Sequence, residues 1–432
     1  MSGVMTTLLD LADLPEVDIP SGPLEAARNS LFDWMVCGHA GSSEPVAQKM
    51  RAFMQAEGGA GVASVFGGGL APARMAALVN GTISHAIDFD DTHFAHVGHL
   101  SVGIYPAALA AGEAEGATKS QIIAAFLLGA EAAIRVGLVL GNGHYNRGFH
   151  QTATAGAFGA TLAAGRLMGL SRAQMRAALG LCATRASGLK SQFGTMGKPL
   201  NAGIAASNGV EAAQLARLGM TSCEDGLMGA QGFVATHSDA PQPDVAPVGE
   251  WIFPAISYKF HACCHGTHAM IEGLRALLPL APETIETITL RTNPRWLSVC
   301  NIAKPATGLE VKFSYAWLAA MVFMGRDTGA FGSYTDAAAG EAALGDIARR
   351  VAVSGDAELS DMQAEGAVVL TDGTRLGFAY DLAKGSDACA LSERLIAKSR
   401  ALLGDAASRL DPVLSASDVP AAELGQHIRT GI

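Results

Sequence analysis

The segment from residue 85 to residue 99 concentrates side chains that exchange protons near neutral pH. It holds three aspartates and four of the chain's twelve histidines: Asp88, Asp90, Asp91, His85, His93, His96 and His99. The flanking sequence is small and apolar, and carboxylates or imidazoles enter such a setting when they are paired, ligated or functional. The pattern therefore indicates an acid/base site. A solvated loop between two buried helices is the alternative.

A second feature is a long stretch without acidic residues. No Asp or Glu occurs from residue 132 to residue 210, although the whole chain has a net charge of −10. The basic residues of this stretch are Arg135, Arg147, Arg166, Arg172, Arg176, Arg185, Lys190 and Lys198. A local positive field favours a small anionic ligand, whereas a buried helical layer that lacks acids is the alternative. We expect no nucleic acid partner, because no binding-fold signature accompanies the basic residues.

The composition predicts a large buried core. Of 432 residues, 49% are hydrophobic and 16% are charged, and the mean hydropathy is +0.26. These values favour two domains and an oligomer that buries further surface. Residues 1–16 lack the basic region of a signal peptide, and Glu131 and Arg135 interrupt the most apolar run, so we expect no membrane span. Seven cysteines without a disulfide spacing suit the cytoplasm.

Helical periodicity dominates the first half of the chain. The expected helices are 24–39, 71–86, 102–112, 119–140, 152–168, 172–188 and 201–217. Thr118 and Ser171 precede two of them and are suitable N-caps.

The pattern changes to α+β after residue 255. Residues 284–291 alternate and are β-branched, which predicts a strand, and residues 367–370 and 374–380 flank a Thr-Asp-Gly turn typical of a hairpin. Further helices are expected at 267–277, 311–324, 339–349 and 390–403. The expected fold is mainly α: a large all-α helical domain over 1–255, completed by 386–432, and a smaller α+β domain over 256–385.

Two possible ligand motifs are weak. The Gly-rich segment 58–69 lacks the Gly-Lys-Ser/Thr sequence and the preceding strand of a nucleotide site. His93, His96 and His99 would fan around a helix rather than converge on one ion. The adjacent Cys263 and Cys264 lack the Cys-x2-Cys spacing of many zinc sites. We therefore expect no metal, with a zinc enzyme as the alternative.

With these residues in view, the chain resembles the MmgE/PrpD family, which includes 2-methylcitrate dehydratases, cis-aconitate decarboxylases and iminodisuccinate epimerases. The resemblance runs through nearly the whole chain. Its strongest blocks are 85–101, 148–160, 196–203 with 208–211, 258–268 and 312–315. They are specific to the family but do not select one of its members.

The resemblance implies an all-α domain built from both chain ends, an inserted α+β lid domain, a homodimer, and a site between the domains that works without metal or organic cofactor. The catalytic residues that it implies are Asp88, Thr92, His99, His150, Lys198 and Lys259. The residues expected to contact the substrate are His96, Lys198, Lys259, Cys264, His268 and Tyr315.

The chemistry of such a family begins or ends with a C–H bond next to a carboxylate. Lys198 and Lys259, with His150, would hold the carboxylates and stabilise the added negative charge. His99 would be the base or acid. Asp88 would orient a neighbouring histidine and Thr92 would hydrogen-bond the substrate. In a dehydratase, His150 would protonate the leaving hydroxyl.

The chain also departs from parts of the family. The decarboxylase branch has His where Cys264 stands and Tyr where Trp317 stands, and the spacing from Thr92 to His99 is one residue longer here. The epimerase branch shares the longer spacing and the triplet 143–145. We expect a cytoplasmic, homodimeric, cofactor-independent lyase for a small anionic di- or tricarboxylate, first of all a dehydratase of a citrate-like (2-methylcitrate-type) hydroxy acid. An epimerase of an iminodisuccinate-like dicarboxylate, a decarboxylase of cis-aconitate type and a non-catalytic anion-binding protein are the alternatives.

Overall fold

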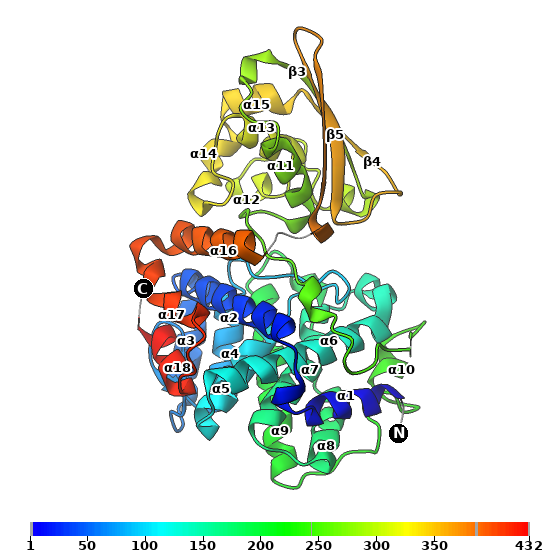
Figure 1. Cartoon of the computed structure of the whole chain (residues 1–432), viewed down its shortest axis with the longest axis vertical. Helices are drawn as coiled ribbons and strands as arrows, with labels where there is room; N and C mark the ends of the chain where they lie inside the picture. The colour runs from blue at the N-terminus through cyan, green and yellow to red at the C-terminus, as the bar shows by residue number, and fades with distance from the viewer. Residues whose placement is uncertain (1–2, 243, 385–387, 431–432) are drawn as a thin grey trace. The chain divides into compact units, whose positions relative to one another are not determined.

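The computed structural model describes residues 3–242, 244–384 and 388–430, and its elements fall into two units (Figure 1). The helical unit comprises Met1–Tyr258 with Leu403–Ile432, and the α+β unit comprises Lys259–Leu402. The sequence places the domain boundaries at 255/256 and 385/386, and the second of these lies outside the described residues. A mainly α fold is confirmed.

The helical unit contains elements from both ends of the chain. Its helices are α1 (Gly3–Asp13), α2 (Ser21–Gly41), α3 (Pro45–Glu57), α4 (Ala73–Ser84), α5 (Ser101–Glu115), α6 (Lys119–Arg147), α7 (Gln151–Leu167), α8 (Arg172–Ala183), α9 (Gly197–Arg217), α10 (Phe233–His237), α17 (Asp411–Leu414) and α18 (Ala421–Arg429). Two short strands, β1 (Ala63–Ser64) and β2 (Leu70–Ala71), pair antiparallel. The C-terminal helices pack on N-terminal ones, α17 against α2 and α18 against α5 (Figure 1).

Helices α4 and α9 pack closely because glycines face each other between them. A Cβ atom on Gly203 of α9 would lie 2.2 Å from the carbonyl oxygen of Leu78 in α4, and one on Gly81 would lie 2.8 Å from the Cα of Gly203. Helix α4 ends just before His85, and α9 carries Lys198 in its first turn. This close contact therefore sets the distance between two parts of the candidate site.

A buried ion pair on α6 fixes the segment that precedes the α+β unit. Glu131 and Arg135 form the predicted i,i+4 pair. Glu131 accepts hydrogen bonds from the backbone N–H groups of Ile252 and Phe253, both at 2.8 Å, and Arg135 donates to the carbonyl of Glu250 at 2.8 Å. Helix α6 is long and apolar enough to cross a membrane, but 94% of its most apolar window is buried inside the protein.

The α+β unit is built on a four-stranded sheet in the order β4-β3-β5-β6. Its strands are β3 (Ile285–Thr292), β4 (Val351–Gly355), β5 (Gln363–Leu370) and β6 (Arg375–Asp381), and only the β3–β4 pair is parallel. Its helices are α11 (His268–Arg275), α12 (Gly308–Val311), α13 (Tyr315–Phe323), α14 (Asp336–Ala339), α15 (Ala342–Ala348) and α16 (Ala388–Leu403). Helix α11 packs on β5 and β6.

Three local expectations differ from the structure for identifiable reasons. Helix α8 ends at Ala183 rather than near 188, because the following segment turns back and the Gly188 carbonyl accepts the N–H of His150. The expected helix 311–324 is split, and the Ser314 hydroxyl caps the second part. Helix α16 groups with the α+β unit, since Arg394 pairs with Glu272 there. The predicted N-caps Thr118 and Ser171 are confirmed, each within a capping box.

Candidate functional site

The loop between α4 and α5 carries the histidine- and aspartate-rich segment. Two of its residues other than glycine have a left-handed backbone, Asp88 with φ 52° and Val97 with φ 55°. Such conformations are uncommon for aspartate and costly for a β-branched residue, and they cluster at functional sites. Backbone hydrogen bonds between Thr92 and Ser257 hold the loop in place, at 2.8 and 2.9 Å.

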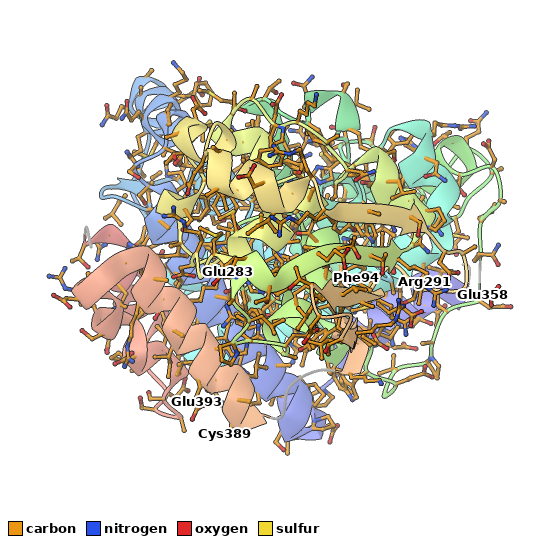
Figure 2. The ribbon with its side chains drawn as sticks, turned by 90° about the horizontal axis from the view of Figure 1, so that it is seen from above. Phe94, Glu283, Arg291, Glu358, Cys389 and Glu393 are labelled. Atoms are coloured by element: carbon orange, nitrogen blue, oxygen red, sulfur yellow. The ribbon has the colours of Figure 1, made fainter. Side chains whose placement is uncertain are left out.

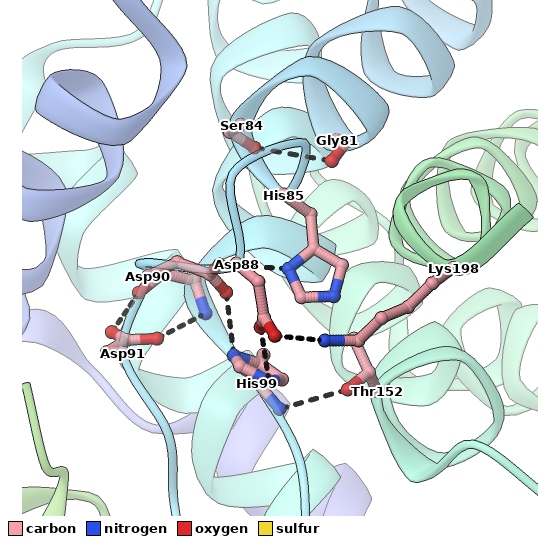
Figure 3. Close-up of polar contacts among 10 residues, drawn as sticks. Gly81, Ser84, His85, Asp88, Asp90, Asp91, His99, Thr152 and Lys198 are labelled. Atoms are coloured by element: carbon pink, nitrogen blue, oxygen red, sulfur yellow. Dashed lines mark hydrogen bonds and ion pairs between the residues drawn. The ribbon is translucent and has the colours of Figure 1, made fainter. Parts of the chain in front are cut away.

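Asp90 joins the two histidines at the ends of this loop (Figure 3). One carboxylate oxygen lies 2.9 Å from Nδ1 of His85, and the other lies 2.8 Å from Nδ1 of His99. Burial alone would raise the pKa of Asp90, but the charges and hydrogen bonds of the two histidines outweigh it and hold that pKa well below its usual value. An ionised carboxylate only accepts hydrogen bonds, so each Nδ1 that faces Asp90 carries a proton.

Asp88 lies on the other side of His99 and contacts a lysine (Figure 3). Its carboxylate is 2.6 Å from Nζ of Lys198 and 3.6 Å from Nε2 of His99. The side chain of Asp88 is 40% exposed and that of Lys198 is 17% exposed. The Nε2 of His99 therefore lies beside a partly exposed Asp88–Lys198 ion pair, whose ammonium group could bind a small anion.

His150 lies next to this cluster at the N-terminal end of α7. The amide nitrogen of Asn201 donates to the carbonyl of Leu189 at 3.2 Å and lies 3.1 Å from Nδ1 of His150. This amide group can only donate, so Nδ1 of His150 accepts and Nε2 carries the proton. Burial, then the charges of His85 and Lys198, hold the pKa of His150 well below its usual value. His150 is therefore a neutral hydrogen-bond donor.

Thr92 and His96 occupy different environments on the same loop. The Thr92 hydroxyl is buried and has no hydrogen-bond partner within the described parts of the chain. His96 is fully buried with Nδ1 3.2 Å from the Ala133 carbonyl of α6, and burial, above all, lowers its pKa to about 3. His96 therefore contacts helix α6, whereas the hydroxyl group of Thr92 is left with a hydrogen that it could donate to a ligand.

The remaining expected residues belong to the α+β unit. Lys259 and His268 are buried, and Cys264 is partly exposed. Burial, then the charges of His265, His261 and Lys259, hold the pKa of His268 well below its usual value. The hydroxyl of Tyr315 donates to the Gly266 carbonyl at 2.8 Å. The convergence of these residues with those of the helical unit stays a prediction.

The same cluster could supply ligands to a metal ion. Potential ligand atoms within 4.8 Å of one another come from His85, Asp88, Asp90 and His99. Two imidazoles with carboxylates suit Zn²⁺, but the ammonium of Lys198 lies 2.6 Å from Asp88. A divalent cation would have to displace the ammonium and the contacts of Asp90, so the donor set fits a proton-transfer network better than a metal centre.

Most of the basic residues in the acid-free stretch do not face this cluster. Ion pairs to acids outside the stretch hold Arg135, Arg147, Arg172 and Arg185. Of these eight basic residues, Lys198 is the one that pairs with Asp88 in the described part of the chain. The positive excess is therefore largely neutralised locally, and the anion-binding argument rests on Lys198.

Sequence reasoning missed three residues that shape the site. Asp90, rather than Asp88 alone, contacts the histidine rings, and Asn201 sets the proton position of His150. Thr152 accepts the backbone N–H of His99 at 3.0 Å. Asn201 and Asp90 both lie in segments that resemble the family, 196–203 and 85–101. The sequence therefore pointed to these segments, but it did not show which side chains contact each other.

Two family models match this chain. Residues 11–246 match the MmgE/PrpD N-terminal domain and residues 261–411 match the MmgE/PrpD C-terminal domain. A cis-aconitate decarboxylase of Aspergillus terreus is 33% identical over 310 residues, which are 67% of this chain and 63% of that protein. A cis-aconitate decarboxylase-like protein, oryM, of Aspergillus oryzae is 31% identical over 294 residues, 63% of this chain and 61% of that protein.

A more distant relative is the human cis-aconitate decarboxylase. It is 28% identical over 274 residues, which are 59% of this chain and 56% of the human protein. The matched regions thus span less than two thirds of the length of each of these relatives. The two domain matches together cover most of the chain, and the chain belongs to the MmgE/PrpD family.

Proposed function

We propose that this protein is a lyase that transfers a proton at a carbon next to a carboxylate of a small di- or tricarboxylate. One observation carries the proposal: Asp90 holds His99 by Nδ1, so that Nε2 faces the Asp88–Lys198 pair. The family and the decarboxylase names of its relatives support a lyase. The roles that we propose for individual site residues rest on the sequence motifs and on the distances between the side chains.

Substrate binding begins at Lys198. A substrate carboxylate competes with Asp88 for the ammonium group, which 17% side-chain exposure leaves within reach of solvent. The hydrogen bond and charge of Lys198 then stabilise the negative charge that grows on the carboxylate oxygens when the adjacent C–H bond ionises. The hydroxyl of Thr92 is a further donor for the substrate.

His99 accepts the proton at Nε2. The C–H electron pair stays on carbon, and the imidazole becomes an imidazolium whose positive charge is stabilised by Asp90 at 2.8 Å and by Asp88 at 3.6 Å. The carboxylate of Asp90 also keeps the ring in the productive tautomer. This division gives Asp90 the orienting role that the sequence suggested for Asp88.

His150 assists the leaving group in a dehydration. Its neutral ring carries a proton on Nε2, as the hydrogen bond from Asn201 requires. When the carbon electron pair forms the C=C bond, the neighbouring C–O bond breaks while Nε2–H of His150 donates a hydrogen bond to the leaving oxygen. That oxygen takes the proton held by the His99 imidazolium and leaves as water, which returns His99 to its starting state. The leading proposal is therefore dehydration of a citrate-like, 2-methylcitrate-type hydroxy acid.

Decarboxylation is the second candidate, because the curated relatives are named cis-aconitate decarboxylases. In that reaction a C–C bond breaks, CO2 leaves, and an imidazolium at His99 protonates the carbanion. Cys264 and Trp317 stand where that branch has His and Tyr, which weighs against it. Epimerisation of an iminodisuccinate-like dicarboxylate uses the same abstraction, with return of the proton from the opposite face.

Product analysis in D2O separates these reactions. The purified protein is incubated with a 2-methylcitrate-type hydroxy acid, cis-aconitate or an iminodisuccinate-like dicarboxylate and followed by NMR. The leading proposal predicts an unsaturated acid from the hydroxy acid. CO2 release from cis-aconitate would favour the second candidate, and absence of turnover and of exchange with all three would contradict the proposal.

The same assay tests for a metal requirement. We propose that no metal or organic cofactor takes part, so activity should survive exhaustive chelation, because His99 and Lys198 supply the base and the positive charge. Stoichiometric zinc or iron in active protein, with loss of activity on its removal, would contradict this.

A further inference from the structure

A pair of cysteines lies together within the α+β unit, outside the histidine and aspartate cluster. The thiol of Cys264 lies close enough to that of Cys300 to raise its pKa. Both residues are held against one segment: the N–H of Cys264 donates to the Lys312 carbonyl at 3.1 Å, and the Cys300 carbonyl accepts the N–H of Tyr315 at 3.0 Å. Backbone pairing between Asn301 and Ser314 extends this contact.

The two thiols differ in access to solvent, and the pKa of Cys300 is raised. Cys264 is partly exposed, whereas Cys300 is buried. The hydrogen bond with Cys264, then burial, raise the pKa of Cys300 well above its usual value. Cys300 therefore stays protonated, and Cys264 is the member of the pair that a peroxide in solution can reach.

Lys259 and Cys263 lie next to this thiol pair. The positive charge of Lys259 acts on Cys300 and Cys263, so it lies close to the sulfur atoms. Cys263 is buried, lies 3.2 Å from the Thr267 hydroxyl, and burial raises its pKa to about 12. A thiol with such a pKa is inert near neutral pH, so Cys263 is an internal control for Cys264.

We propose that Cys264 and Cys300 are an oxidisable thiol pair, in which Cys264 reacts with a hydroperoxide and Cys300 then closes a disulfide. The thiolate of Cys264 attacks one peroxide oxygen, the O–O bond breaks, and water leaves after protonation, which gives a sulfenic acid. The sulfur of Cys300 attacks the oxidised sulfur, the S–O bond breaks and a second water leaves. Two thiols are oxidised by two electrons and one peroxide is reduced to two waters.

The pair touches the residues expected to hold the substrate, since Cys264 is one of them. The thiol chemistry nevertheless stands apart from the proposed reaction, because its readout is a covalent bond. Loss of the disulfide and loss of lyase activity are therefore separate results.

The test is peptide mapping of the folded protein after brief hydrogen peroxide treatment, followed by alkylation and digestion with trypsin. The background variant carries Cys223→Ser and Cys389→Ser, because these two thiols are exposed; Cys389 lies beside Glu393 at the start of α16 (Figure 2). Of the chain's seven thiols this leaves five. We expect loss of two, a cross-link between peptides 260–275 and 296–312, and its reversal by dithiothreitol.

Two further variants assign the roles. Cys300→Ser should abolish the cross-link and leave Cys264 as a sulfenic acid that a 1,3-dione reagent captures. Cys264→Ser, at the partly exposed position, should leave Cys300 reduced, and it keeps the test valid if the buried Cys300→Ser variant does not fold. Persistence of both free thiols in the background variant, or a cross-link that involves Cys263 instead of Cys264, would overturn the proposal.

Discussion

Lys198 is the side chain whose removal should weaken substrate binding most directly. Its ammonium contacts Asp88 at 2.6 Å and is the group that a substrate carboxylate would take over. Lys198→Ala should cost about 1.5–3 kcal/mol of binding, roughly a 10- to 150-fold increase in KM, and should also lower kcat, because the ammonium stabilises the negative charge that develops in the reaction. Lys190→Ala is a matched control, because that ammonium lies over the Tyr145 ring at 3.6 Å.

Steady-state kinetics of the two lysine variants provide the measurement. If Lys198→Ala kept a wild-type KM, or if Lys190→Ala weakened binding equally, Lys198 would not be the carboxylate-binding group.

The types of the site residues were readable in the sequence, but their pairing was not. The density of His and Asp in 85–99 predicted an acid/base site, and the structure places Asp88 and His99 from that segment beside Lys198. Asp88 and Asp90 are two positions apart, and only the left-handed backbone at Asp88 decides which of them turns toward which ring. Sequence spacing carries no information on that backbone angle.

At the scale of elements, the contact of α4 with α9 positions the ends of both helices. Gly203→Ala would place a methyl group 2.2 Å from the Leu78 carbonyl oxygen and 2.3 Å from the Thr82 hydroxyl, so the helices must separate. We expect a loss of stability of about 1–3 kcal/mol. We also expect lower kcat and higher KM, since Lys198 moves away from Asp88 and His99.

Gly156→Ala is the control for that substitution. Gly156 lies within α7, and an added Cβ would meet its nearest neighbours only at 3.9 Å. Urea unfolding and steady-state kinetics should show Gly156→Ala close to wild type. An equally active and stable Gly203→Ala variant would contradict the positioning role of the α4–α9 contact.

Helices with strong periodicity and caps were predictable, and elements shaped by tertiary contacts were not. Thr118 and Ser171 mark true helix starts because a capping box is a local device. The end of α8 depends on a hydrogen bond between His150 and Gly188, which no local pattern reveals. The edge strand β4 is short and its parallel partner β3 lies about 60 positions away in sequence, so its pairing is equally non-local.

The whole molecule should lose stability in mild acid. Burial is the main cause that lowers the pKa of His39 and His144 to about 4 and that of His96 to about 3, from 6.5. Below pH 6.5 the unfolded chain gains protons that the native state excludes, so stability falls as the pH drops from about 6.5 toward 4. Asp91, with a pKa raised to about 7 by burial and by Asp33, acts in the opposite direction.

Urea unfolding at pH 7.5, 6 and 5 measures this net effect. Among the described residues, seven histidines have lowered pKa values: His39, His93, His96, His144, His150, His261 and His268. They outnumber the three acids whose pKa values are raised, Asp91, Glu113 and Glu131, so the midpoint should decrease from the first condition to the last. A midpoint that is constant or increases toward pH 5 would show that these imidazoles titrate normally in the native state.

Assembly is a second property of the whole molecule. The apolar composition and the resemblance favour a homodimer, which stays a prediction. Light scattering should give about twice the chain mass of 44.3 kDa. A stable monomer at micromolar concentration would contradict the dimer.

The central claim is that His99, held by Asp90, transfers the proton next to a substrate carboxylate. Deuterium incorporation from D2O, followed by NMR with the acid that turns over best, tests it most directly. His99→Ala should lower the exchange rate by roughly 10²–10⁴, and Asp90→Asn should lower it and alter its pH profile, while calorimetry shows substrate binding within a few-fold of wild type. Wild-type exchange by folded His99→Ala protein would contradict the account.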